Sequence, residues 1–318
     1  MGFPIHLIDR AMQVYPFRET DRVTDRTVLT IGNFDGVHLG HQALIRKVVE
    51  EAHAGNCASA ILTFDPHPQQ VLKSRAVPVL TTLPLRLRLF EALGLDAAYI
   101  IPFTRELAAK SAEEFLREYL LDHFRVQRMI IGYDFAFGRN RDGTAQALEA
   151  LSRRHGFDLE IFPAVVLGED VVSSTRIREA LSAADFALAE RLLGRAYSVL
   201  AEVERGDRRG HELGFPTLNQ PARDPLPIPF GVYASRAVVD GRAYDGVSNY
   251  GVRPSIGKRD PLLETHLFDF SGELYGQMIE VRPLAKLRGE RKFPSLEALK
   301  TQIAEDCGQA RDVLKGVR

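Results

Sequence analysis

The pattern of apolar segments changes once along the chain, near residue 194, and this change limits the folds that the sequence can adopt. Before it, apolar runs at residues 28–31, 58–64, 97–101, 128–132 and 159–166 alternate with helical patterns at 42–53, 85–93, 111–124, 144–155 and 175–183. Apolar strands that alternate with helices predict a parallel sheet covered on both faces, with right-handed crossovers. We therefore predict an α/β domain over residues 1–188.

After the change, the segments are short, alternate with a period of two and are rich in Gly and Pro. Residues 231–239 predict a strand, Asp240-Gly241 indicates a hairpin turn, and 242–250 predict the returning strand. Residues 264–270 and 278–284 predict further strands, and 295–305 a closing helix. We predict an antiparallel, barrel-like module with a terminal helix over residues 189–318.

The composition is that of an ordinary globular protein. A chain of 318 residues is long enough for two cores. A net charge of −1 argues against nucleic acid as a partner, and no apolar run approaches the roughly 20 residues that span a bilayer. Two cysteines, Cys57 and Cys307, lie far apart without metal-site spacing and favour a cytoplasmic protein with free thiols. The oligomeric state stays open.

The first motif with chemical meaning is GNFDGVHLGH at residues 32–41, directly after a predicted strand. Its glycines let the backbone approach a phosphate, and the helix that follows offers free N–H groups and its positive dipole end to an anion. His38 and His41 are three residues apart and share one face of a helical turn. A zinc pair or two surface histidines are the alternatives, but the strand–turn–helix context favours a phosphate site.

Three more motifs are predicted to lie at the same edge of the sheet. DPHP at residues 65–68 follows the second strand, and Asp134 lies in GYDFAFG after the fourth. Ser174, Thr175 and Arg178 begin the last helix, where an arginine can clamp phosphates beside a second helix N-terminus. Open α/β sheets bind ligands at this edge.

The second motif is GHELGFPTLN at residues 210–219. Thr217 and Asn219 are two apart and face one side of a strand, where their oxygens suit Mg²⁺. A β-turn with a buried Thr is the alternative. Glu264 alternates with His266 on a later strand, and we expect both to point into the barrel.

These motifs resemble those of known enzymes. The HxGH and SSTxIR elements resemble the nucleotidyltransferase superfamily, with its Rossmann-like sheet. Together with TFDPHP and GYDFAFG, they resemble the adenylyltransferase module of bacterial bifunctional riboflavin kinase/FAD synthetases, while GFPTxN and ExHxxDF resemble the riboflavin kinase module. The resemblance covers essentially the whole chain. It implies an enzyme that phosphorylates riboflavin with ATP to FMN and then adenylylates FMN with ATP to FAD and pyrophosphate.

The resemblance also implies residue roles. Glu264 would be the kinase base, and His38, His41 and Arg178 would act in adenylylation. The residues expected to bind ATP or its phosphates are Gly32, Phe34, Asp35, Gly36, Gly40, Ser174, Thr175, Gly210, Gly214, Phe215 and Pro216. Those expected to bind flavin are Asp65, Pro66, His67, Pro68, Asn249 and Arg253, and those expected to bind Mg²⁺ are Thr217, Asn219 and Asp134.

Two other readings of the sequence stay open at this point. One is a nucleotidyltransferase for another phosphate acceptor, with the barrel as a regulatory domain. The other is a flavin- or nucleic-acid-binding module without catalysis. The combination of Thr217, Asn219 and Glu264 argues against the first, because a non-catalytic barrel needs no such set. The near-zero net charge and the lack of a basic aromatic stripe argue against nucleic acid.

Overall fold

The chain divides into two compact units. The computed structural model describes residues 11–18, 23, 25–73, 77–139, 142–205, 215–252 and 261–316. The first unit is Met1–Val77 with Arg86–Ser173, and the second is Pro78–Leu85 with Ser174–Arg318. This division groups residues 174–188 with the second unit, whereas the sequence pattern groups them with the first domain.

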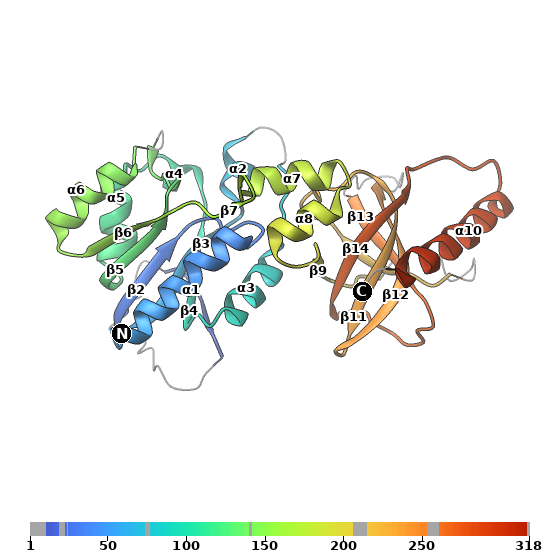
Figure 1. Cartoon of the computed structure of the whole chain (residues 1–318), viewed down its shortest axis with the longest axis horizontal. Coiled ribbons are helices and arrows are strands. Elements are labelled where there is room, and N and C mark those ends of the chain that lie inside the picture. The colour runs from blue at the N-terminus through green and yellow to red at the C-terminus, as the bar shows by residue number, and fades with distance from the viewer. Residues whose placement is uncertain are drawn as a thin grey trace. The chain divides into compact units, whose positions relative to one another are not determined.

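The first unit is built on a parallel six-stranded sheet, as predicted (Figure 1). The spatial order is β1-β4-β3-β2-β5-β6, and every neighbouring pair is parallel. The strands are β1 (Gln13–Pro16), β2 (Arg26–Ile31), β3 (Ala58–Asp65), β4 (Ala97–Pro102), β5 (Arg125–Gly132) and β6 (Asp158–Phe162). From β2 the chain moves first towards β3 and β4 and later to β5 on the other side, so the order reverses beside β2.

Alternate residues of the strands form a core on each face of this sheet. On one face, Val28 and Ile61 pack with side chains of α1 (Leu39–Ala54) and α3 (Leu83–Ala92). On the other face, Leu29 and Leu62 pack with α5 (Ala112–Phe115), the π-helical segment η1 (Leu116–Leu121) and α6 (Ala145–His155). Burial on both faces explains why the strands are almost continuously apolar.

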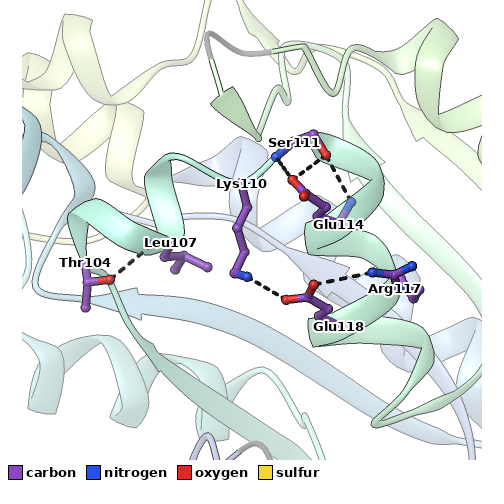
Figure 2. A network of polar contacts seen from close by, with 7 residues as sticks. All are labelled: Thr104, Leu107, Lys110, Ser111, Glu114, Arg117 and Glu118. Carbon is purple, nitrogen blue, oxygen red and sulfur yellow. Dashed lines mark hydrogen bonds and ion pairs between the residues drawn. The ribbon is translucent and has the colours of Figure 1, made fainter.

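The single helix predicted over residues 111–124 consists of two consecutive segments, α5 and η1. Figure 2 shows the polar contacts around its first turns. Its predicted capping box is present: the Ser111 hydroxyl accepts from the Glu114 N–H, and Glu114 Oε2 accepts from the Ser111 N–H at 2.8 Å. Lys110 Nζ lies 2.6 Å from Glu118 Oε2, and Arg117 reaches the other oxygen of that carboxylate. The ion pair between Lys110 and Glu118 joins η1 to the chain two residues after the end of the short helix α4 (Arg105–Ala108).

The fifth predicted strand is shorter than expected. It ends at Phe162, because Pro163 has no N–H for the strand ladder. Val166–Leu167 (β7) and Asp170–Val171 (β8) instead form a small antiparallel hairpin. A short helix, α2 (Pro68–Leu72), follows β3.

The second unit is an antiparallel barrel of six strands, again as predicted. The spatial order is β10-β13-β12-β11-β14-β9. The strands are β9 (Val199–Glu202), β10 (Leu218–Pro221), β11 (Gly231–Val239), β12 (Arg242–Val252), β13 (Pro261–Leu267) and β14 (Met278–Arg288). The two end strands of this order, β10 and β9, are joined by an antiparallel bridge between Asn219 on β10 and Glu204 just after β9. There the Glu204 N–H donates to the Asn219 carbonyl at 2.8 Å. The Gln220 amide reinforces this closure by donating to the Ala201 and Ile279 carbonyls at 2.8 and 2.7 Å.

Among its described residues, the second unit has the helices α7, α8 and α10. The closing helix α10 (Leu296–Lys315) is ten residues longer at its end than predicted, and Ala310 and Leu314 pack on Val232, Ala234 and other residues of the barrel. Two shorter helices, α7 (Ser174–Ser182) and α8 (Phe186–Leu193), precede the barrel. The sequence analysis did not predict α8, which is capped by Asp185 and places Phe186 against Tyr233, with ring centroids 5.9 Å apart.

Candidate active sites

Three predicted motifs of the first unit lie at one edge of its sheet. Residues 32–37 follow β2, residues 65–68 include and follow the end of β3, and residues 133–138 follow β5. Because β3, β2 and β5 are parallel neighbours, their carboxyl ends meet at this edge. The strand order also reverses here, which is where open α/β sheets bind ligands. The predicted convergence of these motifs is therefore confirmed for this unit.

The turn after β2 is tightly constrained. A Cβ atom at Gly32 would lie 3.1 Å from the Phe34 ring. Phe34, Gly36 and Val37 all have positive φ angles, of 50°, 91° and 40°. A β-branched residue such as Val37 rarely adopts this conformation, and strained backbone of this kind is concentrated at functional sites. Gln42 holds the turn by donating to the Val37 carbonyl at 2.9 Å.

The two histidines of the motif stack on each other at the start of α1. Their ring centroids are 3.6 Å apart with an interplanar angle of 18°, and the Phe34 ring meets His41 edge-on at 5.1 Å. His38 is the N-cap of α1, and its Nδ1 accepts from the backbone N–H of His41 at 3.3 Å. Since Nδ1 carries the lone pair, a neutral His38 carries its proton on Nε2. The stacked pair thus presents a ring N–H donor at a helix N-terminus, which suits a phosphate.

The charge state of His41 follows from its surroundings. Burial disfavours the imidazolium, and the neighbouring His38 adds to this, so the pKa of His41 lies well below its ordinary value of 6.5. Its Nδ1 is buried and has no hydrogen-bond partner within the part of the chain that the structure describes. His41 is therefore neutral at pH 7 in the free protein.

The low pKa of His41 should make the stability of the protein depend on pH. Below pH 6.5, the unfolded chain binds a proton at His41 that the folded chain does not, so the free energy of unfolding falls. The contribution of His41 is complete above pH 6.5 and is lost as the pH falls towards the folded-state pKa, by at most about 1.4 kcal/mol per pH unit. Thermal unfolding of the parent and His41→Gln proteins at pH 7.5, 6.5 and 5.5 measures this loss.

We expect the melting temperature of the parent to fall more steeply on acidification than that of His41→Gln. His53, which is exposed in the last turn of α1, provides the matched control His53→Gln, which should keep the parent's slope. Equal slopes for the parent and His41→Gln would contradict the assignment.

The loop after β3 is shaped by a capping box that the sequence analysis did not identify. His67 is the N-cap of α2: its Nδ1 accepts from the Gln69 N–H at 3.2 Å, and its own N–H donates to Gln70 Oε1 at 3.0 Å. Pro68 occupies the first helical turn, as is common. The peptide bond between Asp65 and Pro66 is cis. This part of the chain is thus an ordered turn at the edge of the sheet.

One residue near this edge was missed by the sequence analysis. Arg86 on α3 is 3% exposed, and it donates through Nη1 to the Asn33 carbonyl at 2.8 Å and through Nη2 to the Phe64 carbonyl at 2.9 Å. A signal was present, because Arg86 lies four residues before the fully buried Phe90 and therefore on the buried face of the helix.

The remaining predicted residues of the adenylyltransferase site are placed less tightly. Asp134 is exposed after β5. Burial raises the pKa of Tyr133, and the charge of the neighbouring Asp134 adds to this. Ser174 and Thr175 begin α7, and Arg178 Nε donates to the Pro78 carbonyl at 2.9 Å. These three residues belong to the second unit, so their position facing His38 stays a prediction.

The predicted kinase residues form a row across three strands of the barrel. Asn219 on β10 is paired with Glu264 on β13, and Glu264 is paired with Asn249 on β12. Directly paired residues on antiparallel strands have Cβ atoms about 4.5–5.5 Å apart, so the three side chains are neighbours on one face. The register thus brings together a candidate metal ligand, the candidate base and a candidate flavin contact.

This row lies on the opposite face of the barrel from the one expected. Leu263 and Thr265 are 0% exposed, and they alternate with the half-buried Glu264 and His266. Thr265 also shares a hydrogen bond of 2.7 Å with Ser248. On this strand, Leu263 and Thr265 therefore face the interior, and the expectation that Glu264 and His266 point inward is wrong.

The residues before β10 are tied to the row. His266 Nδ1 donates to the Pro216 carbonyl at 2.8 Å, and the Phe215 ring contacts the His266 ring at 5.5 Å. Asn219 Nδ2 donates to the Thr217 carbonyl at 3.2 Å, which fixes the orientation of the Asn219 amide. Gly210, Gly214 and Arg253 lie outside the described residues.

Comparison with known proteins identifies the family. Residues 20–176 match the family described as FAD synthetase, and residues 193–314 match the family described as riboflavin kinase. A Haemophilus influenzae protein named bifunctional riboflavin kinase/FMN adenylyltransferase is 40% identical over 92% of this chain and 95% of its own length. The chain belongs to the bifunctional riboflavin kinase/FMN adenylyltransferase family. A relative of the same name from Escherichia coli strain K12 is 38% identical over 90% of this chain and 92% of that protein.

A solved structure supports the fold of this bifunctional family member over most of its length. It is titled a macrolide-efflux protein from Streptococcus pneumoniae, has a TM-score of 0.77 and 25% identity, and covers 96% of this chain and 100% of that one. Among the residues that the structure describes here, no helix has both the length and the apolar character needed to cross a membrane.

Proposed function

We propose that the chain makes FMN at the barrel of its second unit and FAD at the sheet edge of its first unit. As a member of its family, the enzyme phosphorylates riboflavin to FMN and adenylylates FMN to FAD, with ATP as co-substrate in both steps. The row of Asn219, Glu264 and Asn249 carries the assignment of the first step, because it lies within the part that matches riboflavin kinases. The stacked histidines support the assignment of the second step.

In the kinase step, Glu264 acts as the base that takes the proton of the riboflavin 5′-hydroxyl as it attacks the γ-phosphate of ATP. Thr217 and Asn219 offer a hydroxyl and an amide oxygen, the hard ligands that Mg²⁺ prefers. Mg²⁺, when bound there, would neutralise charge on the ATP phosphates, and in-line positioning with charge stabilisation accounts for most of the catalysis in such transfers. Phe215 and Pro216 contribute to the nucleotide site, and Asn249 contacts the flavin.

In the adenylyltransferase step, the FMN phosphate attacks the α-phosphate of a second ATP and pyrophosphate leaves. FMN supplies a charged oxygen nucleophile, so no strong protein base is required. His38 and His41 stabilise the charge that grows on the leaving group, together with Arg178, Ser174 and Thr175. The turn containing Gly32, Phe34, Asp35, Gly36 and Gly40 surrounds the phosphates, while Asp134 contacts the nucleotide or Mg²⁺. Residues 65–68 contact the flavin.

The alternative of a nucleotidyltransferase with a regulatory barrel is not supported, because residues 193–314 match riboflavin kinases. We propose that the enzyme works in the cytoplasm without nucleic-acid or membrane partners. Both cysteines are free, which is consistent with a reducing compartment.

The direct test of both activities is one incubation with riboflavin, ATP and Mg²⁺, read by chromatography at successive times. We expect FMN to appear first and FAD to follow, and chelation of Mg²⁺ to stop FMN formation. The kinase step should also survive in a fragment of residues 174–318, because the barrel, α7, α8 and α10 all belong to the second unit. The fragment should phosphorylate riboflavin and form no FAD.

The start of the fragment is set by contacts in the structure. The sequence-based boundary at residue 188 falls inside α8 and would remove both the Asp185 cap, which accepts from the Leu188 N–H at 2.9 Å, and Phe186. A fragment from residue 174 keeps them but lacks residues 78–85, where Val79 donates to the Pro225 carbonyl and Thr82 to the Leu200 carbonyl. We therefore expect a lower melting temperature than in the intact chain. A folded fragment without kinase activity would refute the assignment of this step.

A further inference from the structure

A single buried cation connects two of the loops at the sheet edge of the first unit. The guanidinium of Arg86 donates to the Asn33 carbonyl in the turn after β2 and to the Phe64 carbonyl near the end of β3. It also lies 3.9 Å from an Asp65 carboxylate oxygen. The first loop leads to His38 and His41, and the second is the turn at residues 65–68. One side chain thus bonds to both loops.

Burying the charge of Arg86 costs desolvation energy, which its hydrogen bonds to the two loops offset in part. Desolvation lowers the pKa of Arg86, while the charges of Asp35 and Asp65 act in the opposite direction. An arginine stays charged in proteins, so its charge is buried here with it. Its Nε is buried and has no hydrogen-bond partner among the described residues. Two of its three nitrogens serve the loops, and an apolar side chain would fill the same space without the desolvation cost.

The bonds of Arg86 have the form expected of a clamp. Both acceptors are backbone carbonyls, so they fix the course of the loops whatever side chains those loops carry. The Asn33 carbonyl accepts a second bond, from the Thr63 hydroxyl at 3.2 Å. Thr63 lies on β3 and is 0% exposed. The turn after β2 is therefore attached to α3 and to its neighbouring strand through the same oxygen atom.

We propose that Arg86 is a positioning residue for adenylyl transfer: it holds the phosphate-binding turn at residues 32–37 and the loop at residues 65–68 in register across the edge of the sheet. The inference rests on the proposed function of the first unit. A displacement of about 1 Å at an active site can cost about 10²-fold in rate, so loss of the clamp should be measurable without loss of the fold.

The test replaces Arg86 by Met, which keeps the length and removes the donors, and by Lys, which keeps the charge but cannot reach two carbonyls in the same fork geometry. For FMN adenylylation by the intact chain, we expect Arg86→Met to lower kcat/KM by about 10- to 50-fold, with a raised KM for ATP. Arg86→Lys should lie between Met and the parent. Riboflavin phosphorylation by the same preparations should stay within about twofold of the parent.

The matched control is Arg88→Met, which removes an exposed arginine two positions further along the same helix and should leave both rates unchanged. A purely structural role for Arg86 would reduce kcat in proportion to the unfolded fraction and leave the KM for ATP at the parent value, and that result would overturn the inference. So would parent kinetics in folded Arg86→Met. If the parent itself forms no FAD, the proposed function fails instead.

A second variant keeps the inference testable if Arg86→Met does not fold. Thr63→Val is nearly isosteric and removes the other hydrogen bond to the Asn33 carbonyl. We expect a smaller loss of adenylylation, of about two- to fivefold, again with a raised KM for ATP. In the double variant Thr63→Val/Arg86→Lys, the two losses of adenylylation rate should not simply multiply, because both residues donate to the Asn33 carbonyl. Parent kinetics in Thr63→Val, or strictly multiplicative losses in the double variant, would overturn the clamp.

Discussion

Glu264→Gln is expected to slow the conversion of riboflavin to FMN by about 10²–10⁴-fold, the usual loss when a general base is removed. The substitution keeps the size and shape of the side chain but removes the basic oxygen. Glu264 is half-buried between Asn219 and Asn249 in the row that crosses the barrel, and the core lies on the other face of its strand. The fold should therefore survive the change.

The measurement is paired on one purified variant. Rates of riboflavin phosphorylation and of adenylylation of supplied FMN are compared with those of the parent, and circular dichroism reports the fold. Glu202→Gln is the matched control, because Glu202 is an exposed glutamate on β9 of the same sheet, and it should retain both rates. A folded Glu264→Gln enzyme that phosphorylates riboflavin at the parent rate would exclude Glu264 as the base.

The complementary substitution, His41→Ala, is expected to lower FMN adenylylation by about 10²–10³-fold while riboflavin phosphorylation stays nearly unchanged. This is the loss typical of one donor that stabilises charge in a transition state. His41 stacks on His38 at the start of α1 and is neutral in the free protein. When a nucleotide binds, a ring N–H of His41 would donate to its negatively charged phosphate oxygens.

The helix itself should tolerate this change, because Ala is the strongest helix former and the cap depends on the backbone N–H at position 41 rather than on its side chain. His53→Ala, at the other end of α1, is the control for losing a histidine from the same helix. Equal loss of both activities in His41→Ala, or no loss of either, would contradict the assignment.

The sequence predicted the elements on which the sites are built. Continuous apolar strands that alternate with helices determine a parallel sheet, and the parallel arrangement then brings the ends of β2, β3 and β5 to one edge. The spacing of His38 and His41 likewise predicted a shared face at a helix N-terminus. That His38 accepts the His41 N–H was not predicted, because the rotamer of a cap depends on the turn before it.

Other features could not be derived from pattern alone. Alternation along β13 shows that Glu264 and His266 share a face, but a period of two does not say which face is buried, and here Leu263 and Thr265 occupy the interior. Helix α8 was missed because its eight residues lie where the pattern changes. The π-helical hydrogen bonding of residues 116–121 has no compositional signal, and the buried Arg86 is stabilised by loop carbonyls far away in the sequence.

The bridge between Glu204 and Asn219 has a consequence for how the kinase acquires its activity during folding. Asn219 joins the first and last strands through its backbone, while its side chain is a candidate ligand for the metal that accompanies ATP. Until β9 and β10 meet, Gln220, the residue next to Asn219, cannot donate to the Ala201 and Ile279 carbonyls and complete the barrel. A chain in which β9 and β10 have not met therefore lacks the bridge and the side-chain bonds that hold this part of β10 in place. If Asn219 binds the metal as proposed, the metal site of the kinase is completed by the same contacts that close the barrel.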